Sequence, residues 1–414
     1  MKQSLHIELI TETYPPEVNG VALTVQALEQ GLRGLGHRVA LVRTERAEDS
    51  PRAEPNLVLV QGAPLPSYPG LRFGLPAGRR LHTRWSAQRP DAIYIATEGP
   101  LGWSALGAAR RLGIPVATGF HTRFDDYMGR YGAGFLAPWV FAWLRRFHNR
   151  GDATLVPTLE LQQQLQAQGF HCVQRLGRAV DTRQFHPGWR DAALRERWGL
   201  ADDDIAVLSV GRLAPEKNLG LCLLAFRALQ AERPKARLIF VGDGPSRAEL
   251  QAANPYAIFV GVQRGDELSR HYASADMFVF SSLSETFGNV TLEAMASGLA
   301  TIAFDYGAAR EHLRHGEHGA AVPFGDEAEF IRATVRLGTQ GALFRLGESA
   351  RSAVLHLHPQ EVAREFADLL SQLMLAVASG ILPLPYRDVQ MSRAQDAQER
   401  PATLARPCAA SKVA

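Results

Sequence analysis

The chain has 414 residues, of which 46% are hydrophobic and 21% are charged, as in ordinary soluble globular proteins. This composition excludes intrinsic disorder for most of the chain, and at about 150 residues per domain the length predicts two or three domains. The three cysteines, Cys172, Cys222 and Cys408, form no C-x-x-C pair. Their spacing argues against a zinc ribbon, a redox dithiol or a disulfide framework, and it fits a reducing compartment.

Hydropathy and charge bear on contact with a membrane. The longest nearly apolar stretch, Tyr131–Leu144, has 14 residues. A membrane-spanning helix needs about 20, so we expect none. Residues 1–190 carry 22 Lys and Arg against 15 Asp and Glu, whereas the remainder carries 23 against 27. The basic first half either attracts an anionic partner, such as anionic lipid or nucleic acid, or is an arginine-rich solvated surface.

Short apolar runs alternate with helical segments along both halves of the chain. This alternation is typical of parallel sheets that helices cover on both faces. Strands are expected at residues 5–12, 38–44, 57–61, 92–97 and 116–120, and again at 205–211, 237–242, 258–261, 277–281 and 301–304. We therefore predict an α/β fold with two doubly wound, Rossmann-like domains facing each other across a cleft.

The predicted domains span residues 1–185 and 186–358. A helical pattern at residues 359–380 is expected to pack back on the first domain, and the polar, Arg- and Ala-rich residues 381–414 are expected to form a flexible tail. Ligands of such sheets bind at the carboxyl ends of the strands, so segments that directly follow a strand are the candidates for a site.

The first strand is followed by Pro15-Pro16-Glu17-Val18-Asn19-Gly20. Gly20 would let the backbone approach a ligand closely. The alternative is a plain turn, because Pro, Asn and Gly all favour turns. The dinucleotide fingerprint G-x-G-x-x-G is absent here, which disfavours a nicotinamide-dependent enzyme.

The segment from Phe120 to Tyr127 (FHTRFDDY) follows another strand. His121 stands at the carboxyl end of that strand, where its imidazole can donate to a sugar hydroxyl or to a developing charge. The alternative is a structural histidine.

Residues 134–150 combine five large aromatic side chains with three arginines. Such a segment either lies in a membrane interface or forms a helix that packs on the sheet with one basic end, and we slightly favour the packed helix.

The second series of strands opens with a strand followed by GRLAPEKN, residues 211–218. Arg212 and Lys217 would stand at the carboxyl end of that strand, where Arg can grip a phosphate through two hydrogen bonds and Lys adds a point charge. The alternative is an exposed basic loop with a helix cap at Asn218.

The strongest candidate is SETFGNVTLE, residues 284–293, which leads from a strand into a helix. The free N–H groups at the start of that helix favour a diphosphate. Glu285 and Glu293 would then accept hydrogen bonds from hydroxyls on either side of the phosphates, as in a sugar diphosphate joined to a ribose. The alternative is one capping carboxylate and one surface glutamate.

Taken together, SETFGNVTLEAMASGLATIAFDYGAAREHL, VGRLAPEKNL and TETYPPEVNGVA resemble the retaining nucleotide-sugar glycosyltransferases of the GT-B fold, glycosyltransferase family 4. The resemblance covers residues 5–375 and is closest to members that glycosylate membrane lipids or use GDP-mannose. It implies a transfer of a hexose from UDP-glucose, UDP-glucuronate or GDP-mannose to a lipid such as diacylglycerol or phosphatidylinositol. The alternatives are a soluble or polysaccharide acceptor, or a nucleotide-sugar-binding protein without catalysis.

The resemblance also implies residue roles. The catalytic set would be His121, which lines the sugar site, Glu285, which holds sugar hydroxyls, and Arg212 and Lys217, which neutralise the diphosphate. The donor-binding set would be Gly20, Arg212, Lys217, Glu285, Phe287, Gly288, Asn289, Val290 and Glu293, the last holding the ribose. No metal and no nucleic acid is expected. The protein would be cytoplasmic or peripheral at the inner face of the cytoplasmic membrane, which its N-terminal domain would contact.

Overall fold

The structure, a computed structural model, describes residues 4–17, 19–46, 49, 56–64, 72–121 and 137–379. These residues form two compact units, the first comprising described residues up to 177 together with 359–379, and the second comprising 178–358. The chain passes between units after Gly177, earlier than the expected boundary at 185/186, because Val180 and Phe185 belong to the core of the second unit. The expected tail at 381–414 and residues 122–136 lie outside the described residues.

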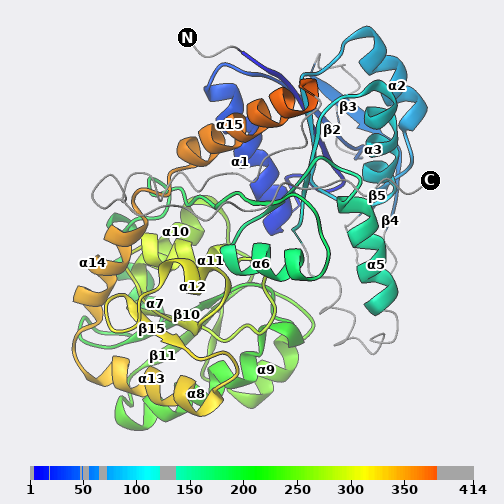
Figure 1. The fold of residues 1–414 in the computed structure, drawn as a ribbon. Coiled ribbons are helices and arrows are strands. Elements are labelled where there is room, and N and C mark those ends of the chain that lie inside the picture. The colour runs from blue at the N-terminus through cyan, green and yellow to red at the C-terminus, as the bar shows by residue number, and fades with distance from the viewer. Residues whose placement is uncertain are drawn as a thin grey trace, which may run out of the picture. The chain divides into compact units, whose positions relative to one another are not determined.

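The first unit is built on a parallel sheet with strand order β3-β2-β1-β6-β7-β8-β9 (Figure 1). In the central register, Ile7 pairs with Val39 on one side and with Ala92 on the other. Each residue of β6 is buried, so this strand needs helices on both faces of the sheet. The strands are β1 (His6–Thr11), β2 (Arg38–Thr44), β3 (Leu57–Val60), β6 (Ala92–Ile95), β7 (Val116–Gly119), β8 (Ala153–Val156) and β9 (Val173–Arg175), and a separate antiparallel pair joins β4 (Gly62–Pro64) to β5 (Arg72–Gly74).

Helices from both ends of the chain cover the first sheet. The C-terminal helix α15 lies beside α1 (Figure 1), and its Phe366 is fully buried in the same core as Leu28 of α1. Trp85 and Leu106, from α2 and α3, fill the core on the other face. The helices are α1 (Gly20–Gly34), α2 (Gly78–Ala87), α3 (Pro100–Leu112), α5 (Ala137–His148), α6 (Leu159–Ala167) and α15 (Pro359–Ala378).

The second unit repeats this architecture on a parallel sheet with order β12-β11-β10-β13-β14-β15. The neighbouring residues Val207 and Leu208 of β10 point into different cores, one on each face. The strands are β10 (Ala206–Val210), β11 (Arg237–Val241), β12 (Ile258–Phe259), β13 (Met277–Phe280), β14 (Ala300–Phe304) and β15 (Gly319–Val322).

The helices of the second unit are divided between the two faces. Helices α8 and α13 pack together on one face, and α11 and α14 on the other (Figure 1). The helical elements are η2 (Pro187–Trp189), α7 (Ala192–Arg197), η3 (Pro215–Lys217), α8 (Leu219–Glu232), α9 (Arg247–Ala253), α10 (Gly265–Ser274), α11 (Asn289–Ala296), α12 (Gly307–His312), α13 (Glu327–Thr339) and α14 (Leu343–Val354).

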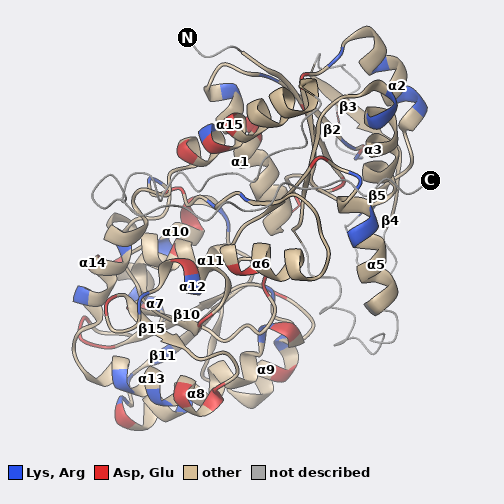
Figure 2. Ribbon diagram, viewed as in Figure 1, with Lys and Arg blue, Asp and Glu red and all other residues tan. Residues whose placement is uncertain are grey.

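The predicted α/β class and the two parallel sheets are confirmed. Charged residues lie mainly on helices and loops, and few lie on the strands (Figure 2). Strands β8, β9 and β15 were not predicted. They have only three or four residues each, and β15 reads Gly-Ala-Ala-Val, so local sequence gives little β signal.

Candidate active site

An ion pair joins two loops at the carboxyl edge of the second sheet. The turn η3 follows β10 and brings Lys217 Nζ against Oε1 of Glu285, which lies in the loop after β13. The side chains are 19% and 15% exposed, so a ligand can reach both charges. Two residues that the sequence singled out separately, 68 positions apart, are therefore brought into contact.

Two serines at the end of β13 hold these loops in place. Ser281 Oγ lies 3.1 Å from the carbonyl oxygen of Lys217 and 2.8 Å from that of Asn218. Ser282 Oγ donates to Oε1 of Glu285 at 2.8 Å. Asn218 is the N-cap residue of α8, as the alternative expected, but it adopts a left-handed conformation and its side chain makes no capping hydrogen bond.

Arg212 adds a second cation at the same edge. Its side chain is 42% exposed, and Nη1 lies 3.8 Å from Oε1 of Glu216. A narrow hollow here is lined by Gly211, Arg212, Lys217 and Phe280, among others. Two cations beside a hollow at the end of a strand suit an anionic group such as a diphosphate.

The loop after β13 continues into the start of α11. Phe287 is buried, and Gly288 precedes the helix with a left-handed φ of 92°. Asn289 and Val290 form the first turn, where backbone N–H groups have no acceptor within the helix. Because β10 and β13 are neighbours in the parallel sheet, the helix start and the turn that carries Lys217 lie at neighbouring positions along the same carboxyl edge.

Glu293 lies one turn further into α11 and contacts a different partner from Glu285. Tyr272 Oη, from α10, donates to its Oε2 at 2.8 Å. Burial raises the pKa of Glu293 to about 7, because desolvation of the carboxylate outweighs the hydrogen bond from Tyr272. A buried carboxyl group with this pKa changes its charge near neutral pH.

The first unit carries the remaining predicted residues, His121 and Gly20. His121 follows β7, and its Nε2 lies 2.7 Å from Oη of the buried Tyr94 in β6. Gly20 is the first residue of α1 rather than part of the preceding loop, and Asn19 caps the helix by accepting from the backbone N–H of Ala22 at 2.8 Å. Gly20 is exposed, so its backbone is open to a ligand.

A buried polar cluster at the carboxyl edge of the first sheet was not predicted. Glu12 Oε1 accepts from the backbone N–H of Leu101 at the start of α3, at 3.0 Å, and burial raises the pKa of Glu12 to about 7. His148 of α5 lies 3.2 Å from Oε1 of Glu98 and 2.8 Å from Oγ1 of Thr118. Glu12 could have been found as a carboxylate directly after a strand, whereas nothing local distinguishes His148.

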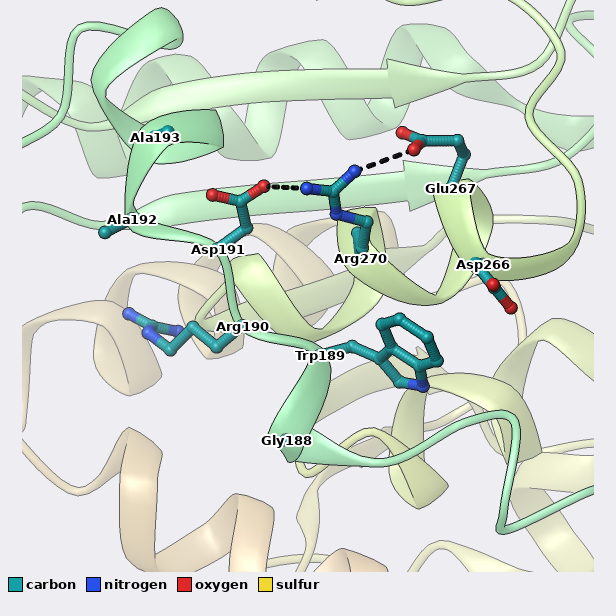
Figure 3. Close-up of a pocket in the computed structure, with 9 residues that line it drawn as sticks. All are labelled: Gly188, Trp189, Arg190, Asp191, Ala192, Ala193, Asp266, Glu267 and Arg270. Atoms are coloured by element: carbon teal, nitrogen blue, oxygen red, sulfur yellow. Dashed lines mark hydrogen bonds and ion pairs between the residues drawn. The ribbon is translucent and has the colours of Figure 1, made fainter.

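A larger hollow of about 530 Å³ lies in the second unit near η2 and the start of α10 (Figure 3). None of the sequence-predicted site residues lines it. Its central cation, Arg270, is held between Asp191 at 2.7 Å and Glu267 at 2.8 Å. Because this charge is balanced within the hollow, the hollow is a poorer anion site than the Lys217 edge.

The described residues contain neither a metal-binding cluster nor a membrane-spanning helix. Within the described residues, no three His, Cys, Asp or Glu side chains gather as a metal site requires. In the same part of the chain, no helix has the length and apolar character to cross a bilayer.

Comparisons with known proteins match both units. A family model described as glycosyltransferase family 4 matches residues 18–184, and one described as glycosyl transferases group 1 matches residues 204–340. The chain is 37% identical over 327 residues to a GDP-mannose-dependent alpha-mannosyltransferase of Mycobacterium tuberculosis, covering 78% of this chain and 85% of that protein. It is 29% identical over 312 residues to alpha-monoglucosyldiacylglycerol synthase of Streptococcus pneumoniae, covering 72% and 71% respectively.

Among solved structures, sucrose-phosphate synthase from Thermosynechococcus elongatus superposes with a TM-score of 0.72 over 89% of this chain and 99% of that chain. At 20% sequence identity, this likeness concerns the fold alone. It confirms the GT-B architecture that the sequence motifs implied.

Proposed function

The chain belongs to glycosyltransferase family 4, and on this premise we propose that it is a retaining transferase that forms a glycolipid. The donor is a UDP- or GDP-hexose, and the acceptor is a hydroxyl of a membrane lipid such as diacylglycerol or phosphatidylinositol. The observation that carries the proposal is the contact of Lys217 with Glu285 beside the start of α11. The names of the two relatives, one referring to GDP-mannose and one to a glucosyldiacylglycerol, support the donor and acceptor classes.

The diphosphate of the donor binds where positive charge gathers. Lys217, Arg212 and the N–H groups from Phe287 to Val290 bind it, and we assign the exposed backbone of Gly20 to the same ligand. When the bond between C1 and the phosphate oxygen breaks, its electron pair moves to the diphosphate. Fixed cations and helix N–H groups stabilise that charge, so the step needs no metal ion.

The sugar and the ribose are held by the two glutamates. Glu285 accepts hydrogen bonds from hydroxyls of the transferred sugar. It also contacts Lys217, which binds the diphosphate leaving group. Glu293 accepts the hydrogen bond of the Tyr272 hydroxyl through Oε2. Its Oε1 accepts a hydrogen bond from a ribose hydroxyl. We also assign His121, whose Nε2 lies 2.7 Å from Tyr94 Oη, to the transferred sugar.

For the transfer step we propose the course of the retaining members of the family. The acceptor hydroxyl oxygen forms the new bond to C1 on the face from which the diphosphate departs, so the anomeric configuration is retained. The acceptor proton passes to the released diphosphate, which thereby serves as the base.

The first unit presents a surface suited to an anionic membrane. Helix α5 exposes 77% of Trp139 and 42% of Trp143, and Arg145 and Arg146 follow in its last turn. The inner side of α5 packs through Leu144 and Phe147, so the helix combines the packed and the interfacial alternatives. Figure 2 shows basic and no acidic residues along α5. We place the protein in the cytoplasm, at the inner face of the cytoplasmic membrane.

The test of this function is a product assay by mass spectrometry. Purified protein is mixed with detergent-dispersed diacylglycerol or phosphatidylinositol, paired in turn with UDP-glucose, UDP-glucuronate and GDP-mannose. A lipid with one added hexose, absent with Glu285→Ala, supports the proposal. Release of nucleotide without a glycolipid moves the acceptor to a soluble or polymeric molecule. If no donor binds or turns over, the transferase proposal fails.

Membrane contact is tested separately by co-sedimentation with vesicles. The double variant Trp139→Ala/Trp143→Ala should lose binding to phosphatidylglycerol vesicles, whereas Tyr256→Ala, which removes an aromatic side chain 82% exposed on the second unit, should bind as the wild type does. Equal binding by both variants would remove α5 from the proposal.

A further inference from the structure

The segment DYGAAR, residues 305–310, belongs to the matched motifs but received no role from the sequence. Asp305 and Tyr306 form the turn after β14, and the remaining four residues begin α12. Tyr306 Oη donates to the carbonyl oxygen of Ser282 at 2.9 Å. The backbone N–H of Ala308 donates to the carbonyl oxygen of Phe287 at 2.7 Å. The two accepting residues lie on either side of Glu285 in the chain, so the turn holds the Glu285 loop at both ends.

A glycine makes this close approach possible. Gly307 adopts a φ of 56°, and a Cβ at this position would lie 2.6 Å from the carbonyl oxygen of Phe287. A side chain here would therefore push the two loops apart. At the Ser282 end the contact from this turn is the Tyr306 side chain, beside the hydrogen bonds of Ser281 and the backbone N–H of Leu283, which donates to the carbonyl oxygen of Glu216 at 3.3 Å.

The Ser282 end leads directly to the Glu285 carboxylate. Ser282 accepts from Tyr306 through its carbonyl oxygen and donates through Oγ to Oε1 of Glu285, the oxygen that Lys217 also contacts. The ring of Tyr306 is held in turn by Phe324, with centroids 4.9 Å apart and an interplanar angle of 79°. Tyr306 and Glu285 are thus two hydrogen bonds apart.

We propose that Tyr306 is a positioning residue for the reaction, which orients the Glu285 carboxylate toward the donor sugar through Ser282. This inference rests on the proposed function, because it gives Glu285 a role at the sugar. Tyr306 itself touches no reacting atom. Its hydroxyl acts on turnover, since Glu285 engages the sugar, and it leaves binding of the nucleotide diphosphate unchanged.

The experiment is a double-mutant cycle of Tyr306→Phe with Glu285→Gln, measured as donor turnover. Tyr306→Phe alone should lower kcat about three- to tenfold, the effect of one lost hydrogen bond. In the Glu285→Gln background the same substitution should have an effect of less than about twofold, because the group through which it acts is already changed. The affinity for GDP or UDP, measured by calorimetry, should be that of the wild type.

The controls separate this inference from the proposed function. Tyr256→Phe removes a hydroxyl from an exposed tyrosine of the same unit and should leave kcat unchanged. Equal losses from Tyr306→Phe in both backgrounds, a parallel loss of nucleotide affinity, or no loss at all would overturn the positioning role. Full activity of Glu285→Gln would instead refute the proposed site. If the Tyr306→Phe variant does not fold, Ser282→Ala removes the next hydrogen bond, from Ser282 Oγ to Glu285. The double-mutant cycle of Ser282→Ala with Glu285→Gln then tests the same inference.

Discussion

Replacing Glu293 with glutamine should stabilise the protein above neutral pH while weakening donor binding. The carboxyl group accepts from Tyr272 Oη at 2.8 Å, and the carbonyl oxygen of glutamine can accept the same hydrogen bond. The substitution therefore removes a charge and leaves the local packing nearly unchanged. Burial raises the pKa of Glu293 from 4.5 to about 7, so the folded state resists the ionisation that the unfolded chain undergoes freely.

The size and the sign of the effect follow from linkage. A raised pKa means that the folded state binds the proton more tightly. Protonated Glu293 thus adds stability that is present below about pH 4.5 and is lost as the pH rises toward 7. The shift corresponds to about 3 kcal/mol of unfolding free energy above pH 7, by the conversion of about 1.4 kcal/mol per pKa unit. Glu293→Gln should recover most of that amount at pH 8 and much less at pH 5.

The assay is urea unfolding of wild type and variant at pH 5 and pH 8. The variant's gain in unfolding free energy should grow by about 2 kcal/mol between the two pH values. Glu249→Gln, at an exposed position on α9, controls for charge removal in general. The donor KM of Glu293→Gln should rise, since one oxygen acceptor for the ribose is lost. A gain that does not depend on pH would refute the argument from burial.

Three further substitutions test the donor site. Gly20→Ala should change the free energy of unfolding by no more than about 1 kcal/mol, because an added Cβ meets no heavy atom of the described residues within 4 Å. The same substitution should lower turnover roughly tenfold or more, because the added methyl group blocks the donor phosphates. Gly34→Ala, at the other end of α1 with the same open space, should keep full activity. Lys217→Ala should raise the donor KM and lower kcat, about 100-fold in kcat/KM, in steady-state assays. Glu285→Ala should mainly lower kcat; wild-type constants for both variants would refute the site.

The fold class could be predicted from the sequence because the strand patterns and the helix patterns both indicated parallel sheets covered by helices. Strands such as β10 are continuous apolar runs, and the helices between them have the spacing that covers both faces of a sheet. The loops that carry Lys217 and Glu285 could be identified because each follows a strand, and carboxyl ends of parallel strands share one edge.

What the sequence did not reveal are partners that meet only in three dimensions. Tyr272 and Glu293 come from different helices, and nothing in α10 marks this tyrosine as the donor to a buried carboxylate. Tyr306 holds the carbonyl oxygen of Ser282, an acceptor that every residue possesses, so the pairing has no sequence signature. Short strands such as β9, with three residues, were missed because pairing with β8, and not propensity, makes them strands.

The most direct test of the central claim is the anomeric configuration of the lipid product, determined by NMR after incubation with an α-linked nucleotide sugar and the lipid acceptor. Retaining transfer at the Lys217–Glu285 edge predicts an α-glycoside of the lipid, formed by the wild type and lost with Glu285→Ala. A β-glycoside, or an α-glycolipid formed at the wild-type rate by Glu285→Ala, would contradict it.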